Sequence, residues 1–201
     1  MKLYDISQEV FSCAVFPGDP APERISLMKM GEGAVCNLTA LKMCAHNGTH
    51  VDAPCHFIAG GKSIDRIPLD RFVGWCCVFF HEGDITAEDA ESLIKKARLI
   101  SRNDQAGASR RILVRGGATV TPEAARVFAR HGILLFGNES QAVGPENAPM
   151  DVHRVMLDAE IVLLEGIRLS AVPDGIYLLC AAPLNLSGSD GSPCRAVLID
   201  L

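Results

Sequence analysis

The chain has 201 residues, with 19 Lys and Arg against 24 Asp and Glu, so its net charge is -5. A chain of this length can bury one core without disulfide support, and a hydrophobic content of 48% is too high for a disordered protein. Because the chain has no apolar run long enough to span a bilayer and its basic residues are scattered, we expect neither a membrane nor nucleic acid as a partner.

The amino-terminal part of the chain is rich in Pro and Gly. The first seven residues include Asp5 and lack the apolar core of a signal peptide, which predicts a cytoplasmic protein. Residues 17–22 contain three prolines and cannot sustain a helix or a central strand. We therefore predict an ordered loop or arm over residues 11–35, of a kind that two subunits could exchange.

The rest of the chain alternates between short apolar runs and polar segments. The apolar runs predict buried strands at residues 72–80, 112–114, 133–136, 161–164, 176–180 and 196–199. Residues 101–111 are polar and predict a surface loop. Since no linker or repeat interrupts the pattern, we expect one α/β domain over residues 1–201, with a mixed sheet or barrel-like β core and flanking helices.

Two helices have clear start signals. Thr86 precedes residues 87–98 and has Asp89 three positions later, as in a capping box. Thr121 is followed by Pro122 and opens a second helix, which we expect to stop at residues 131–132.

The eight cysteines have neither zinc-finger nor disulfide spacing. Cys76 and Cys77 are adjacent, and no pair has the two-residue gap of a zinc knuckle. Reduced thiols that pack as small hydrophobes are the expected state. A metal, if bound, must therefore be held by imidazole and carboxylate groups.

Three of the six histidines fall between residues 46 and 56. His46, His50, Asp52 and His56 all have even numbers, and an extended chain points alternate side chains to the same side. A helix would place Asp52 about 200° around from His50. We therefore predict that the segment is extended, or a strand that runs into a turn.

Imidazole and carboxylate ligands together suit Zn²⁺ or Mn²⁺. A catalytic site usually has about three protein ligands and one open position, and His46, His50 and Asp52 could supply the three. The alternative is that these histidines are polar residues on a solvated strand face. That would be the better interpretation of any one of them alone, whereas four such residues on one face favour a metal site.

The stretch from His46 to Phe57 resembles the His-x-Gly-Thr-His-x-Asp-x-Pro-x-His signature of the cyclase family of metal-dependent hydrolases, which includes bacterial kynurenine formamidases and isatin hydrolases. The similarity extends from Asp5-Ile6-Ser7 to the closing residues 164–198. It implies a swivelling β/β/α fold and hydrolysis of an amide C–N bond by metal-activated water. The leading activity is that of an arylformamidase acting on N-formylkynurenine, and the alternative is opening of a lactam ring as in isatin.

The resemblance also implies the roles of individual residues. It implies two divalent ions per chain, Zn²⁺ or Mn²⁺, with one held by His46, His50, Asp52 and Glu165 and the other by Asp52, His153 and Glu165. His56 would be the proton shuttle.

The sequence itself supports these late ligands unequally. Glu165 directly follows the apolar run 161–164, where a carboxylate is costly unless a cation pairs with it; the alternative is an exposed acid at the strand end. His153 lies on an expected short helix, and only its family spacing to Glu165 singles it out. His81 and His131 are expected to be structural.

Three departures from the family concern the substrate. Phe16 stands where kynurenine formamidases carry Trp, and we expect it either to contact an aromatic amide substrate or to pack in the core. Residues 137–139 read Gly-Asn-Glu in place of Gly-Ile-Asp, and Asn185 replaces a frequent Lys. The family also implies a homodimer or homotetramer. A different class of function, a metal-binding protein without turnover, is a further alternative.

Overall fold

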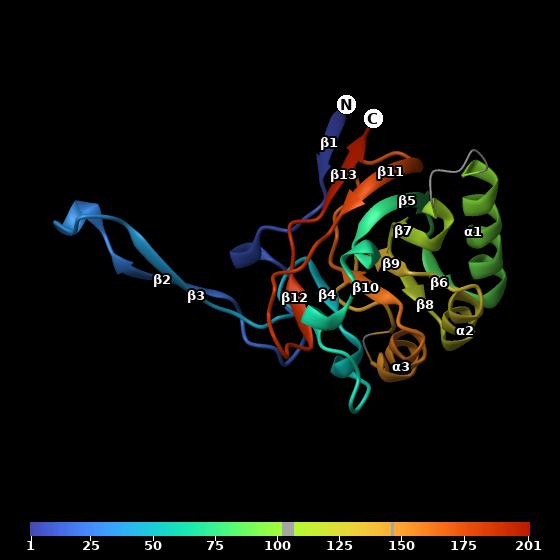
Figure 1. The fold of residues 1–201 in the computed structure, drawn as a ribbon, viewed down its shortest axis with the longest axis horizontal. Coiled ribbons are helices and arrows are strands. Elements are labelled where there is room, and N and C mark those ends of the chain that lie inside the picture. The colour runs from blue at the N-terminus through green and yellow to red at the C-terminus, as the bar shows by residue number, and fades with distance from the viewer. Residues whose placement is uncertain (102–106, 146) are drawn as a thin grey trace.

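A curled nine-stranded mixed sheet forms the centre of the molecule (Figure 1), in a computed structural model that describes residues 1–101, 107–145 and 147–201. Its strand order is β1-β13-β11-β5-β7-β9-β10-β4-β12. The strands are β1 (Lys2–Asp5), β4 (His50–Asp52), β5 (Val73–Phe80), β7 (Arg111–Arg115), β9 (Leu135–Asn138), β10 (Val162–Glu165), β11 (Gly175–Cys180), β12 (Gly191–Pro193) and β13 (Val197–Asp200). The central strands β5, β7, β9 and β10 run parallel, whereas the other neighbours are antiparallel.

Three helices cover one face of this sheet: α1 (Ala87–Ile100), α2 (Pro122–Arg130) and α3 (Met150–Asp158) (Figure 1). The predicted capping box at Thr86 is present, because its side chain accepts from the Asp89 N–H and Asp89 accepts from the Thr86 N–H. Thr121 caps α2 in the same way, through the Ala124 N–H. Both helix predictions are thus confirmed. Within the described ranges, no helix has the length and hydropathy to cross a membrane.

The sheet is buried on both faces. Phe128 and Phe136, with ring centroids 5.0 Å apart, belong to the core beneath the helices, and Ile6, Phe72 and Leu198 belong to a second core on the other face. Burial on both faces explains why the central strands read as continuous apolar runs. The α/β class with a mixed sheet is confirmed.

All six predicted strands are present, but β9 begins two residues later than expected. The Ile133 N–H donates to the Phe128 carbonyl, and Gly132 has a φ of +64°. Ile133 therefore closes the end of α2, as in a Schellman motif, and does not pair in the sheet.

The amino-terminal arm contains a hairpin that the sequence did not predict. Strands β2 (Glu23–Met28) and β3 (Leu38–Lys42) form a two-stranded sheet of their own, which projects far from the body (Figure 1). The hairpin runs past residue 35, to Lys42. Its apolar side chains are largely exposed, with Leu27 at 58% and Leu41 at 61% of full exposure.

Several smaller elements were also missed. Strands β6 (Gly83–Ile85) and β8 (Ala118–Val120) form a short parallel pair. Within the predicted surface loop 101–111, residues 102–106 lie outside the described part of the chain. The end of that segment differs from the prediction, because Ala108 and Arg111 are buried and Arg111 begins β7.

The cysteines are unpaired, as predicted. All eight lie in the described residues and none forms a disulfide. Cys76 and Cys77 are fully buried in β5, and burial raises the pKa of the Cys77 thiol to about 12. Such a thiol packs as a small hydrophobe and is not a nucleophile at neutral pH.

Candidate metal centre

Strand β4 contributes two buried polar side chains, His50 and Asp52, to a polar site inside the molecule. It lies between β10 and β12, with His50 opposite Glu165 of β10 and Asp52 opposite Gly191 of β12. Alternation along the strand turns His50 and Asp52 to the same side, while Val51 packs into the hydrophobic core. The pairing with β10 brings Glu165 beside them from the far end of the sequence.

His46 and His56 reach the site by other routes. Of the two predicted forms, the structure has the strand that runs into a turn, because Pro54 opens a 3-10 turn over Pro54–His56 directly after β4. A second turn, which the sequence did not predict, precedes the strand at Gly48, where φ is +70°. The turns fold the two flanking histidines back over the strand. Their rings stack with centroids 4.1 Å apart and an interplanar angle of 25°.

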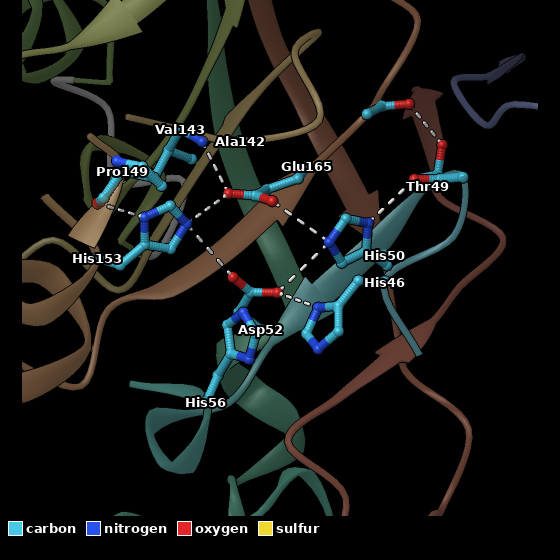
Figure 2. A network of polar contacts seen from close by, with 12 residues as sticks. His46, Thr49, His50, Asp52, His56, Ala142, Val143, Pro149, His153 and Glu165 are labelled. Atoms are coloured by element: carbon cyan, nitrogen blue, oxygen red, sulfur yellow. Dashed lines mark hydrogen bonds and ion pairs between the residues drawn. The ribbon is translucent and has the colours of Figure 1, made fainter. Parts of the chain in front are cut away.

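Asp52 and Glu165 are the centre of a network of polar contacts (Figure 2). Asp52 Oδ1 lies 2.9 Å from His46 Nδ1 and 3.4 Å from His50 Nε2. Glu165 lies 3.3 Å from His50 Nε2 and 3.1 Å from His153 Nε2 through its two oxygens, and His153 Nε2 is 3.7 Å from Asp52 Oδ2. The structure therefore brings His153 on α3 and Glu165 on β10 to the histidine segment.

Backbone groups fix the orientation of the innermost side chains. The ring nitrogen Nδ1 lies 3.0 Å from the Gly48 carbonyl in His50 and 2.8 Å from the Pro149 carbonyl in His153. A carbonyl only accepts, so both Nδ1 atoms carry the proton and Nε2 is left for a ligand role. The Val143 N–H donates to Glu165 Oε1 over 2.7 Å, which holds that carboxylate in place.

The buried charges of the site are strongly coupled. Burial disfavours the charged forms, but hydrogen bonds to His46 and His50 outweigh it and hold the pKa of Asp52 well below its usual value. Against the same burial, Glu165 raises the pKa of His153 to about 9. Without a cation, the two carboxylates thus draw protons onto their histidine neighbours.

The residues present fit a divalent metal. Ligand atoms of His50, Asp52 and Glu165 lie within 4.8 Å of one another, as do those of His46, Asp52 and His56. His46 Nε2 and Asp52 Oδ2 are buried atoms for which the described residues offer no hydrogen-bond partner. Imidazole nitrogens and carboxylate oxygens with free lone pairs are the donor set of zinc and manganese sites.

A cavity of about 200 Å³ opens onto this centre. Its lining comprises Phe16, Asp19, His46, His50, His56, Phe57, Gln141, Ala142, Pro149, His153 and Glu165. Phe16 is half-buried and lines the cavity, outside both hydrophobic cores. Asn185 is exposed and is not part of the lining.

Sequence reasoning did not single out five of the residues that line the cavity: Asp19, Phe57, Gln141, Ala142 and Pro149. Phe57 stacks against His153, with centroids 4.7 Å apart, and Asp19 belongs to the arm. The side-chain oxygen and nitrogen of Gln141 are buried without a hydrogen-bond partner among the described residues. The departure from the family pattern after the 133–136 run was the available signal for Gln141.

The two histidines expected to be structural lie elsewhere. His81 Nε2 is 3.2 Å from the Asp84 carbonyl, and His131 Nε2 is 2.9 Å from Glu91 on α1. Neither lines the cavity.

Comparisons with known proteins agree on one family. A family model described as "Putative cyclase" matches residues 4–145. A kynurenine formamidase of Salinibacter ruber is 34% identical over 215 aligned positions, which cover 100% of this chain and 98% of the relative.

Solved structures share the whole fold. A potential metal-dependent hydrolase with cyclase activity has a TM-score of 0.80 and 28% identity, over 98% of this chain and 96% of that one. Isatin hydrolase A from Labrenzia aggregata has a TM-score of 0.76 at 21% identity, over 98% and 93%.

The fold and the buried set of histidines and carboxylates define a metal-dependent hydrolase. The chain belongs to the cyclase family.

Proposed function

We propose that the protein hydrolyses the amide C–N bond of an N-formyl arylamine, with N-formylkynurenine as the leading substrate. The observation that carries this proposal is the cavity in which Phe16 and Phe57 face the same space as His50, His56 and Glu165. Aromatic rings beside a hydrolytic centre suit an aromatic amide. The likeness to a kynurenine formamidase over the full chain supports the same substrate class.

We assign two divalent ions, Zn²⁺ or Mn²⁺, to this centre. His46, His50, Asp52 and Glu165 would hold one ion, and Asp52, His153 and Glu165 the other. When bound, such ions polarise the substrate carbonyl and make water acidic enough to supply the nucleophile at neutral pH. His46 Nε2 and Asp52 Oδ2, which form no hydrogen bond with the described residues, support this ligand set.

His56 is assigned the proton transfers. Its imidazole lies at the cavity, and burial lowers its pKa, so the ring is neutral at pH 7 and can act as a base. It takes a proton from the attacking water as the C–O bond forms, and it gives that proton to the nitrogen as the C–N bond breaks. Formate and a free arylamine are the products, and His56 returns to its starting state.

The experiment that tests this function combines metal analysis with a substrate panel. The purified protein is assayed on N-formylkynurenine, formanilide and isatin, and products are identified by mass. Release of formate from the formamides with two bound ions is the expected result. Ring opening of isatin alone would instead support the lactam hydrolase alternative. Retained metal without turnover of any of the three would favour a metal-binding protein.

We further propose that two chains, or two pairs of chains, associate through the arm. The β2–β3 hairpin stands clear of the body and exposes Ile25, Leu27 and Leu41 (Figure 1). An isolated two-stranded hairpin is at best marginally stable in water, so a partner surface is needed to order it. The double variant Leu27→Ser, Leu41→Ser should lower the mass measured by light scattering to that of one chain. An unchanged mass would contradict assembly through the hairpin.

A further inference from the structure

A carboxylate outside the proposed ligand set touches the proposed shuttle. Asp190 Oδ2 lies 3.2 Å from His56 Nδ1 and 3.3 Å from His46 Nε2. Asp190 is separated from His56 by 134 positions in the chain, and sequence reasoning did not single it out. Its side chain is half-exposed, in contrast to the buried Asp52.

The backbone around Asp190 is fixed from both sides. The Ala53 N–H donates to the Asp190 carbonyl over 2.8 Å, and the Ile64 N–H donates to the Ser189 carbonyl over 2.9 Å. The next residue, Gly191, begins β12 opposite Asp52. A Cβ atom at position 191 would come within 2.6 Å of His46 Cε1, so the histidine ring lies directly against this backbone.

We propose that Asp190 is a positioning residue, which holds His56 in the tautomer with the proton on Nδ1. This inference rests on the proposed function, in which His56 transfers the protons. An ionised carboxylate can only accept, so the Nδ1 atom that faces it must donate. A neutral imidazole with its proton on Nδ1 has a free lone pair on Nε2. Among the described residues His56 Nε2 has no hydrogen-bond partner, so it is free to receive the proton of the attacking water.

Catalytic histidines in other enzymes often have a carboxylate hydrogen-bonded to the ring nitrogen that does not transfer the proton. Such a carboxylate does not take the proton; it keeps the ring in the correct tautomer and orientation. Two other roles predict different behaviour. A loop anchor would affect folding without acting through His56, and a metal ligand would affect metal content.

The test is a double-mutant cycle on turnover of N-formylkynurenine. Asp190→Ala alone should lower kcat by roughly 10- to 100-fold, less than the loss of the shuttle itself, with KM and the bound metal unchanged. In a His56→Ala background the same change should cost less than about 3-fold, because the imidazole on which it acts is gone. Asp190→Asn should fall between wild type and Asp190→Ala, since an amide can accept or donate and no longer selects one tautomer.

A matched control lies beneath the same loop. Asp65 Oδ1 accepts from the Gly188 N–H over 3.0 Å and lies outside the cavity, so Asp65→Ala removes this contact with the loop without touching His56. It should leave kcat near the wild-type value. If Asp65→Ala lowers kcat as much as Asp190→Ala, or if Asp190→Ala lowers kcat as much with His56 absent as with it present, the positioning role is wrong. Loss of metal in Asp190→Ala would likewise overturn it.

A second measurement does not depend on turnover. In metal-free protein labelled with ¹⁵N-histidine, two-bond proton–nitrogen spectra at about pH 8 report which nitrogen of a neutral imidazole carries the proton. The His56 signals, identified by their absence in His56→Ala, should show the Nδ1–H tautomer in wild type and lose that preference in Asp190→Ala. If wild type turns over none of the substrates, the proposed function fails while this result still decides the inference. An Nε2–H tautomer in wild type would overturn the inference alone.

Discussion

His153 Nε2 lies 3.1 Å from Glu165 Oε1, which joins the middle of α3 to the end of β10 through the buried site (Figure 2). Helix α3 and strand β10 are consecutive in the chain, so this contact closes a short local unit. The same Glu165 oxygen accepts from the Val143 N–H. The Pro149 carbonyl orients the His153 ring and the Val143 N–H orients the Glu165 carboxylate, so backbone groups position both side chains before any ligand binds.

The pH dependence of the metal-free protein follows from this pair. Burial lowers the pKa of His153, but Glu165 outweighs it and raises the pKa to about 9, above the ordinary 6.5. The stabilising contribution is therefore fully present below about pH 6.5 and is lost as pH rises through about 9. We expect the melting temperature in EDTA to fall over this window. With Zn²⁺ or Mn²⁺ bound the fall should be smaller, because a ligand histidine is unprotonated throughout. An equal fall in His153→Gln would contradict the assignment.

His50→Ala should abolish both metal binding and activity. It removes a ligand that is buried and fixed by the Gly48 carbonyl, so the remaining donors cannot close the coordination shell. Metal analysis and turnover of N-formylkynurenine provide the two readouts. His131→Ala, on the surface at the end of α2, serves as the matched control. Stoichiometric metal with near-normal turnover in His50→Ala would contradict the proposed metal centre.

His56→Ala should separate chemistry from metal binding. The ring lies close enough to His46 and Asp52 to act as a ligand, so metal content is the decisive measurement. If His56 is the shuttle, kcat falls by roughly 10² to 10⁴ while metal content is unchanged. His81→Ala provides the control. Metal loss in step with His50→Ala would make His56 a ligand.

Glu165→Gln should leave one ion per chain. The amide keeps the shape of the side chain and can still accept from the Val143 N–H, but it cannot balance the charge of two cations. Metal analysis by mass spectrometry gives the count, with Glu160→Gln, an exposed change at the end of α3, as the control. Two ions and full activity in Glu165→Gln would show that the carboxylate is dispensable.

Phe16→Ala should weaken the binding of aromatic amides and spare the metal. Loss of one aromatic pair costs about 0.5 to 1.5 kcal/mol, which corresponds to a several-fold rise in KM for N-formylkynurenine. Phe16→Trp should lower KM for the same substrate. Phe11→Ala is the matched control, since Phe11 belongs to the same arm and lies outside the cavity. A normal KM together with a much lower melting temperature would show that Phe16 packs structurally.

The sequence was informative where local rules decide the structure. The caps at Thr86 and Thr121 and the apolar runs of the parallel strands depend on neighbours along the chain, and all of them are present. The short strand β12 pairs with β4, which is far away in the sequence, and its three residues carry too little pattern to predict a strand. Strand β4 is equally short, and only the even spacing of its polar residues indicated it.

The residues of the candidate site also fall into those that the sequence indicated and those that only the fold brings together. His46, His50, Asp52 and His56 stand close together in the sequence, and Glu165 follows an apolar run, so their types and spacing indicated a metal. Period-two alternation accounts only for His50 and Asp52. The turns around the strand bring the other two histidines in, and a strand pairing brings Asp190, which had no sequence signal.

The position of β4 between β10 and β12 has a consequence for biosynthesis. The ribosome releases His50 and Asp52 more than a hundred residues before the strands that flank them, because β10 begins at Val162 and β12 at Gly191. Until β10 has emerged, β4 has no neighbour on either side, and until β12 follows it has a neighbour on one side only. The site that β4 forms with β10 and β12 is therefore complete only when nearly the whole chain has been synthesised. A chain shortened before Asp190 would keep the histidine segment but lack both Asp190 and β12.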